Sequence, residues 1–251
     1  MIRLEHLVSY TNNLLESNLQ DYCPNGLQVE GKGEVRRLVS GVTASLALLE
    51  AAIAAQADAI LVHHGYFWRG ENPCITGLKQ QRLRLLMAHD ISLLAYHLPL
   101  DDHPVYGNNI QLGKRLGFKA EGKFGTPGQP PVAWHGQLTI PMTGQAFAQH
   151  LSERLGRVPL HIPGKIEPIR SIGWCSGAAQ AYIEQAALLG LDAYVTGEVS
   201  EQTVHIARET GIHFFAAGHH ATERYGAPAL AGHLAEMFQL EHEFIDIDNP
   251  A

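Results

Sequence analysis

The sequence predicts an α/β fold made of two similar α/β domains. Short apolar strands alternate with helical segments along the whole chain, which is typical of a largely parallel sheet. Strands such as AILV and HFFAA are almost entirely apolar, as expected where helices cover both faces of a sheet. A stretch of the first half also resembles a stretch of the second half, which indicates that the two domains repeat one topology.

In the first half, hydrophobic periodicity predicts a helix over residues 2–17. Turn formers follow, including the pair Asn25-Gly26, and strands then alternate with helices. Either Thr43 or Ser45 can cap the second helix, and Gly117 ends the last one. The expected elements are strands at 37–42, 58–62 and 92–96, and helices at 43–57, 78–89 and 107–116.

The segment AEGKFGTPGQPPVAWHG, residues 120–136, is dense in Gly and Pro and has no helical period. It is therefore the expected linker, with domains at 1–125 and 126–251 and a C-terminal segment that can pack back on the first domain. A loop is expected near 156–168. The elements predicted after the linker are strands at 136–140, 169–175, 192–196, 213–217 and 242–247, and helices at 143–155, 177–189, 200–210 and 222–238.

Composition excludes several classes of protein. The 251 residues are 45% hydrophobic, enough for substantial cores, and a formal net charge of -7 argues against a large nucleic-acid interface. No apolar run is long enough to cross a bilayer, and the N-terminus lacks the apolar centre of a signal peptide. The three cysteines are widely spaced without a CxxC pair, so neither disulfides nor a cysteine metal site are indicated. We expect a cytoplasmic protein with neither membrane nor nucleic acid as a partner.

The internal repeat consists of two matched blocks. Residues 41–65, which end in DAILVHHG, match residues 173–198, which end in DAYVTGE, and residues 93–107 match residues 214–226. Two Ala-rich helices can resemble each other by chance. The second block makes chance a weaker explanation, because each copy has a histidine with a carboxylate four residues on.

The repeat also selects candidate site residues. It pairs His97 with His219 and Asp101 with Glu223, and it places the pair His63-His64 on Gly197-Glu198. All of these follow predicted strands, and ligands of open α/β sheets bind beyond the carboxyl ends of the strands. Imidazole and carboxylate together suit Fe, Zn, Mn, Co or Ni. A single histidine at a strand end is more commonly structural, but three such groups favour a metal site.

Some assignments stay open at this level. His220 is either a ligand or only the neighbour of His219, and the repeat favours the neighbour. Glu198 is either a carboxylate at a helix N-terminus or part of the site. The two adjacent histidines are expected to leave strand geometry, with Gly65 helping the turn. The motifs of other chemistries, namely GxSxG, GxxxxGK[ST] and GxGxxG, do not occur in the sequence.

Six motifs spread over nearly the whole chain are specific in combination: PNGLQVEG, GVTAS, DAILVHHG, HLPLD, TGEVSEQ and GHHATE. With them the chain resembles the YbgI-type proteins of the Ngg-interacting-factor-like family, which carry the name GTP cyclohydrolase I type 2 homologue. The resemblance implies a dinuclear metal site in the cleft between two α/β domains and a toroidal homohexamer, a trimer of dimers. It implies two divalent metal ions per chain, with the ligands His63, His64, Asp101, His219 and Glu223.

Two functional hypotheses follow. In the first, the protein is a metal-dependent hydrolase of a small molecule, in which metal-bound hydroxide attacks a C–N or phosphoester centre and His97 or Glu198 moves protons. Ring opening of GTP fits the family name. In the second, the protein is not an enzyme but a metal-binding or scaffold ring protein. The two differ in whether a coordination position stays open beside a cavity for a substrate.

Overall fold

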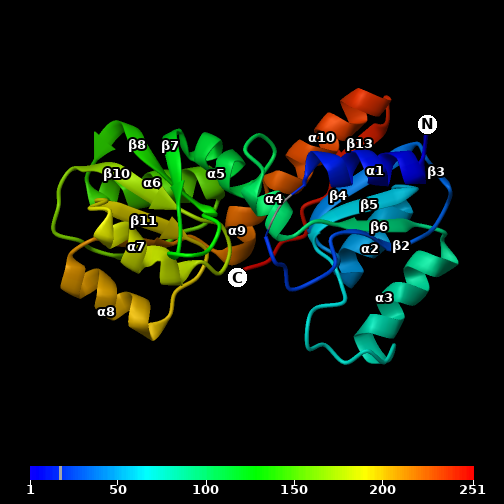
Figure 1. The fold of residues 1–251 in the computed structure, drawn as a ribbon, viewed down its shortest axis with the longest axis horizontal. Coiled ribbons are helices and arrows are strands. Elements are labelled where there is room, and N and C mark those ends of the chain that lie inside the picture. Colours follow the sequence, from blue (N-terminus) through cyan, green and yellow to red (C-terminus); the bar gives the residue numbers. More distant parts are fainter. Residues whose placement is uncertain (17–18) are drawn as a thin grey trace. The chain divides into compact units, whose positions relative to one another are not determined.

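The computed structural model describes residues 1–16 and 19–251 and has a mixed α/β fold (Figure 1). The chain forms two compact units, each with its own sheet. The first unit holds residues 1–107 and 226–248, and the second holds residues 108–225 and 249–251. Among the described residues, no helix is long and apolar enough to cross a membrane.

The first unit is built on a five-stranded sheet in the order β13-β4-β5-β6-β2. Its members are β2 (Gly26–Val29), β4 (Arg37–Thr43), β5 (Ala59–His64), β6 (Ser92–Ala95) and β13 (Glu241–Phe244). All neighbours are parallel except β2, which runs antiparallel to β6. A separate antiparallel pair joins β1 (Ile2–Arg3) to β3 (Glu34–Val35).

Helices cover both faces of this sheet (Figure 1). On one face lie α1 (Leu4–Leu14) and α10 (Gly226–Phe238), and on the other lie α2 (Leu46–Ala54) and α3 (Gly77–Ala88). Side chains alternate along a strand, so Leu61 packs with the first pair of helices and Val62 with the second. This explains why β5 is apolar at successive positions. The short helix α4 (Leu98–Asp102) follows β6.

The second unit has a six-stranded sheet in the order β7-β8-β10-β11-β12-β9. Its strands are β7 (Phe118–Phe124), β8 (Ala133–Met142), β9 (Leu160–Ile162), β10 (Ile169–Trp174), β11 (Ala193–Thr196) and β12 (His213–Ala216). The pairs among β10, β11 and β12 are parallel, and the other pairs are antiparallel. The parallel strands therefore form the centre of the sheet.

Helices again cover both faces of the sheet. One face packs against α5 (Asn108–Leu116) and α6 (Gly144–Leu155), and the other against α7 (Ile183–Leu188) and α8 (Glu201–Thr210). The short elements η1 (Gln180–Tyr182) and α9 (His219–Glu223) precede α7 and follow β12. The order β10-α7-β11-α8-β12-α9 has the same succession as β4-α2-β5-α3-β6-α4 in the first unit.

In each unit, an aspartate at the start of the middle parallel strand accepts hydrogen bonds from the backbone of the preceding strand. Oδ2 of Asp58 accepts hydrogen bonds from the backbone N–H groups of Arg36 and Arg37, both at 3.0 Å. Asp192 does the same for Arg170 and Ser171, at 2.8 and 2.9 Å. These bonds satisfy backbone donors at the beginning of β4 and β10. They give a structural reason for the Asp-Ala pair that opens both copies of the sequence repeat.

The segment that the sequence marks as a linker is an antiparallel hairpin. β7 and β8 pair from Phe118 to Phe124, and only residues 125–132 between them form a loop. Gly136 lies where a Cβ atom would overlap the backbone carbonyl of Lys119, so this glycine permits close strand pairing instead of marking a turn. Because the hairpin pairs with β10, the two units divide between residues 107 and 108, and not near residue 125.

Several other elements differ from the sequence-based prediction. The first helix begins at Leu4 and ends at Leu14, and residue 17 of the predicted helix lies outside the described residues. The predicted helix 222–238 is two helices, α9 and α10, and Ser45, not Thr43, caps α2. Among the elements that were not predicted from the sequence are β2, β9 and α4, each of which is too short to show a period.

Replacing the aspartate anchors tests their contribution. Asp58→Ala and Asp192→Ala are each expected to lower the free energy of unfolding by about 0.5–1.5 kcal/mol, because backbone donors at the strand starts, one of them partly buried in each unit, lose their acceptor. The exposed Asp90→Asn serves as the control. Denaturant unfolding measures the effect, and values like that of the control would contradict the assignment.

The anchor at Asp58 also predicts a pH dependence. Burial opposes its ionisation, but the N–H groups of Arg37 and Arg36 and the ammonium of Lys32 outweigh burial and lower its pKa below the ordinary 3.8. A lowered pKa stabilises the fold above pH 3.8, and this stabilisation is lost as the pH falls through the lower, folded value. The deficit of Asp58→Asn relative to wild type should therefore shrink below about pH 4.

Candidate metal centre

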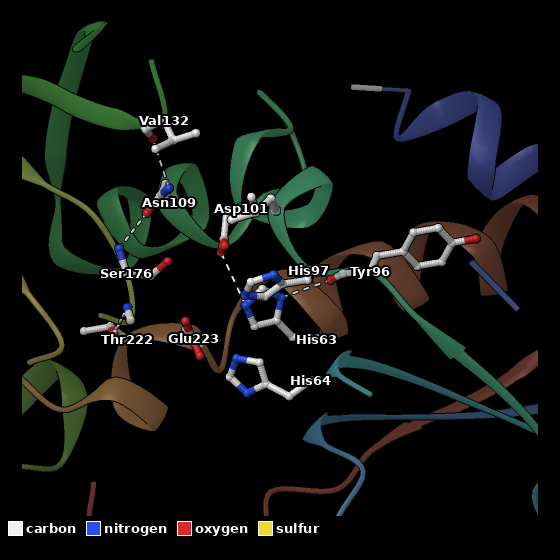
Figure 2. A network of polar contacts seen from close by, with 12 residues as sticks. His63, His64, Tyr96, His97, Asp101, Asn109, Val132, Ser176, Thr222 and Glu223 are labelled. Atoms are coloured by element: carbon white, nitrogen blue, oxygen red, sulfur yellow. Dashed lines mark hydrogen bonds and ion pairs between the residues drawn. The ribbon is translucent and has the colours of Figure 1, made fainter. Parts of the chain in front are cut away.

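The paired histidines end strand β5 instead of following it. β5 runs through His64, which pairs with Thr43 of β4, so the expectation that both histidines leave strand geometry is wrong. Their ring centroids are nevertheless only 4.5 Å apart. His63 is fully buried, and its Nδ1 lies 3.0 Å from the carbonyl oxygen of Tyr96 (Figure 2). Nδ1 of His64 lies 3.1 Å from Oγ1 of Thr43.

Gly65 allows the chain to pass close to β2 and β6 after the two histidines. A Cβ atom at this position would overlap Oε1 of Gln28 and the Cβ atom of Ala95. The Gln28 carboxamide accepts from the N–H of Tyr66 at 2.7 Å and donates to its carbonyl at 3.1 Å. The glycine therefore serves close packing, and the carboxamide fixes the exit from β5.

His97, between β6 and α4, is held by the loop of residues 21–25. Its Nδ1 lies 2.7 Å from Oδ1 of Asp21, and its backbone N–H donates to Oδ1 of Asn25 at 2.7 Å. The other carboxylate oxygen of Asp21 accepts from the N–H of Leu98 at 2.9 Å. Burial alone would raise the pKa of Asp21, but hydrogen bonds from His97 and Asn25 outweigh it and lower the pKa to about 2. The partner of the imidazole is thus a carboxylate.

The first unit brings four of the expected site residues together. The ring centroid of His97 lies 5.0 Å from that of His63 and 5.8 Å from that of His64. Each of the three can offer a nitrogen within 4.8 Å of the others. Oδ1 of Asp101, on α4, lies 3.6 Å from Nε2 of His63 (Figure 2). Imidazoles and a carboxylate at one sheet edge form a donor set for a divalent transition metal.

Cys23 lies within reach of Asp21 and His97. Burial raises the pKa of its thiol to about 12, and the negative charge of Asp21 adds to the shift. Without a bound metal, the thiol is therefore protonated at neutral pH.

In the second unit, α9 presents a histidine and a glutamate one turn apart. Gly218 precedes the helix with φ +98°, a conformation that glycine adopts readily and that turns the chain from β12 into α9. Nε2 of His219 lies 3.1 Å from Oε2 of Glu223, and its Nδ1 lies 2.7 Å from Oε1 of Glu198. Glu223 is 4% exposed at its side chain. Glu198 contacts the site, whereas Ser200 caps α8.

Hydrogen bonds between strand-end loops support this group. The N–H of Ser176 donates to Oδ1 of Asn109 at 2.7 Å, and the N–H of Gly177 donates to Oγ1 of Thr222 at 3.0 Å. Figure 2 shows the contacts of Asn109 with Ser176 and Val132. Thr222 thereby joins the loop after β10 to the helix that carries Glu223.

Two carboxylates make the surroundings of His219 attractive to positive charge. The hydrogen bond with Glu223 has the largest effect and raises the pKa of the His219 imidazole. Burial lowers this pKa and Glu198 raises it further, so that it reaches about 9. A cavity of about 570 Å³ opens beside this group in the second unit, and its lining includes Arg157, Leu160, Glu198 and His219.

The expected residues thus form one group within each unit. His63, His64, His97 and Asp101 gather in the first, and Glu198, His219 and Glu223 in the second. Sequence reasoning did not identify Asp21, Asn25 or Gln28. The repeat has no counterpart for the loop that carries them, and the signals there were the turn pair Asn25-Gly26 and the motif PNGLQVEG.

Comparison with known proteins places the chain in a defined family. The family model described as Duf34/NIF3 (NGG1p interacting factor 3) matches residues 2–250. A Pseudomonas aeruginosa protein named GTP cyclohydrolase 1 type 2 homolog is 59% identical, over 100% of this chain and 99% of that protein. An Escherichia coli K12 protein of the same name is 51% identical over 99% and 98%.

Solved structures agree with this placement. A structure of protein ybgI, described as of unknown function, matches with a TM-score of 0.95 at 50% identity and covers 100% of both chains. A Thermus thermophilus protein, TTHA1606, matches with a TM-score of 0.88 at 32% identity, also over 100% of both chains. The mixed α/β fold is therefore shared over the full length.

Substitution of Gly65 tests whether the fold depends on close packing directly after the two histidines. Gly65→Ala is expected to lower the free energy of unfolding by about 1–3 kcal/mol, because the new methyl group overlaps Gln28 and Ala95. Gly33→Ala is the matched control, because a Cβ atom there meets no heavy atom within 4 Å. Equal stability of the two variants would refute this role of Gly65.

Proposed function

Since this chain belongs to the Duf34/NIF3 family, we propose that it is a metal-binding protein that holds two divalent ions per chain. The proposed ligands are His63, His64, Asp101, His219 and Glu223. The observation that carries the proposal is that each unit, by itself, gathers imidazole and carboxylate groups beyond its parallel strands. Such mixed nitrogen and oxygen donors suit Fe, Zn, Mn, Co or Ni.

The environment of the donors supports metal binding more than a purely structural role. A ligating histidine usually gives its second ring nitrogen to a carbonyl or carboxylate. His63 does this with the Tyr96 carbonyl, and His219 with Glu198. Asp101 and Glu223 are both almost fully buried beside an imidazole. Carboxylates in such places need a positive partner, which a metal ion supplies.

We propose hydrolysis as the reaction. A bound divalent metal ion acts as a Lewis acid and activates water. The relatives are named GTP cyclohydrolase 1 type 2 homologs, so ring opening of GTP is the first reaction to test. Glu198 is the proposed proton-transfer group, because it lines the cavity of the second unit and its side chain is 44% exposed. Its hydrogen bond to Nδ1 of His219 also orients that ring.

Metal content tests the first part of the proposal. Protein purified without chelator should contain more than about one divalent ion per chain by elemental analysis. His64→Ala and Glu223→Ala should each lower this content, since each removes a proposed ligand, and His89→Ala should not, because His89 is exposed at the end of α3. Content below about one ion per chain, or unchanged by both variants, would disprove the assignment.

Turnover tests the second part and separates an enzyme from a metal store or scaffold. With metal supplied in excess to offset weaker binding, Glu198→Gln should lower kcat by about 10²–10⁴-fold, as for loss of a general acid or base. GTP consumption measured by chromatography provides the rate. Turnover that survives removal of the metals, or that does not depend on Glu198, would rule out the proposed mechanism.

A further inference from the structure

We propose that Arg157 binds an oxyanion group, a phosphate or a carboxylate, of the ligand that occupies the cavity in the second unit. The inference rests on the proposed function in taking that ligand to be the substrate, and it adds a substrate class, an organic anion. The observation behind it is a guanidinium on the cavity wall whose hydrogen-bond acceptor is a carbonyl oxygen from residues 249–251.

The turn between α6 and β9 places Arg157 at the cavity. α6 ends at Leu155, and Gly156 follows with φ +71°, a left-handed conformation that commonly ends helices and that glycine adopts readily. The N–H of Gly156 donates to the carbonyl of Ser152 at 2.9 Å, and Nη2 of Arg224 donates to that of Leu155 at 2.6 Å. Both bonds satisfy carbonyl groups at the end of α6, so the residue after this turn has a defined position.

Gly218 makes room for the guanidinium at the start of α9. A Cβ atom at this position would lie 2.8 Å from both Cδ and Nε of Arg157 and 3.1 Å from its Cζ. The arginine side chain therefore lies directly against the backbone that leads into His219. Gly218 thus has a second role besides the turn into α9, because it admits a side chain that is always positively charged.

The charge of Arg157 has no carboxylate partner among the described residues, 1–16 and 19–251. Glu198, which lines the same cavity, lies 2.7 Å from Nδ1 of His219 instead. The acceptor that Arg157 does have is the carbonyl oxygen of Pro250, to which Nη1 donates. A phosphate or carboxylate is a stronger partner for a guanidinium than a neutral carbonyl, because it accepts two parallel, charge-assisted bonds. An oxyanion can therefore replace the Pro250 carbonyl.

The rest of the lining indicates that the anion is part of an organic molecule. Val158, Leu160 and Val199 also line the cavity, and their side chains are exposed. Apolar side chains beside one cation fit a ligand with an apolar or ring-shaped body and an anionic group. The volume of about 570 Å³ is in the range of small-molecule sites. His219 borders the same space, so the anion would hold the ligand beside the proposed reaction site.

Residues 249–251 compete with such a ligand for Arg157. Besides the bond from Arg157 to Pro250, the backbone N–H of His220 donates to an oxygen of Ala251 at 3.2 Å, and Ala251 is part of the cavity lining. An anion that binds the guanidinium has to displace the Pro250 carbonyl, and the surroundings of Ala251 then change. This consequence distinguishes an arginine that binds a ligand from one that only holds residues 249–251.

Anion binding by the full-length protein, as purified, tests the proposal. The probes are phenylphosphonate and benzoate, which share a ring and differ in the anionic group, and calorimetric titration measures their affinities. Arg157→Gln should weaken binding of the preferred probe by about 10–100-fold, because two charge-assisted bonds are lost, and Arg157→Lys should restore part of it. Arg154→Gln is the matched control: it makes the same change of charge at an exposed position of α6 and should leave the affinity unchanged.

Nuclear magnetic resonance gives a second readout at residues 249–251. In ¹⁵N-labelled wild type the preferred probe should shift the amide signals of Ala251 and His220, and in Arg157→Gln it should not. Binding of a probe to metal ions is common to the Arg157→Gln and Arg154→Gln variants, so their comparison isolates Arg157. Equal affinities of these two variants for both probes, or unchanged Ala251 signals in wild type, would overturn the anion site. Absence of metal from the same wild-type samples would instead refute the proposed function.

Discussion

In each unit, hydrogen bonds between three adjacent parallel strands bring the site residues to one sheet edge. Parallel strands end on the same side, so residues that follow β4, β5 and β6, or β10, β11 and β12, meet there although they are far apart in sequence. Asp58 supports the pairing of β4 with β5, and Asp192 supports the pairing of β10 with β11. The positions of the histidines and carboxylates depend on this pairing.

A second constraint is that imidazoles must be held in one orientation before they can serve as ligands. In the first unit a carbonyl, a hydroxyl and a carboxylate each contact one Nδ1 atom, and in the second unit Glu198 does so for His219. Such contacts restrict the direction of each ring, and a carbonyl or carboxylate partner also favours the tautomer with the proton on Nδ1. Glycines contribute by making room, since Gly65 lets Gln28 approach the end of β5.

Some patterns in the sequence located the structural elements correctly, and others did not. Runs of apolar residues located the central strands well, because burial on both faces leaves few polar positions in them. Density of Gly and Pro was misleading at residues 120–136, since Gly136 sits inside a strand where close pairing excludes a side chain. The short helices α4 and α9, five residues each, gave no periodic signal, yet they carry Asp101 and Glu223.

The sequence by itself determined the α/β class, the family and the histidines and carboxylates at the strand ends, because periodicity, repeats and motifs are local patterns. Only the tertiary structure decided that His63 and His64 stay on β5, that the units divide after residue 107, and that Asp21 holds His97. Asp21 and His97 are 76 residues apart in sequence. Contacts over such distances form only when the chain folds, since they depend on side-chain packing and hydrogen-bond geometry that no local pattern encodes.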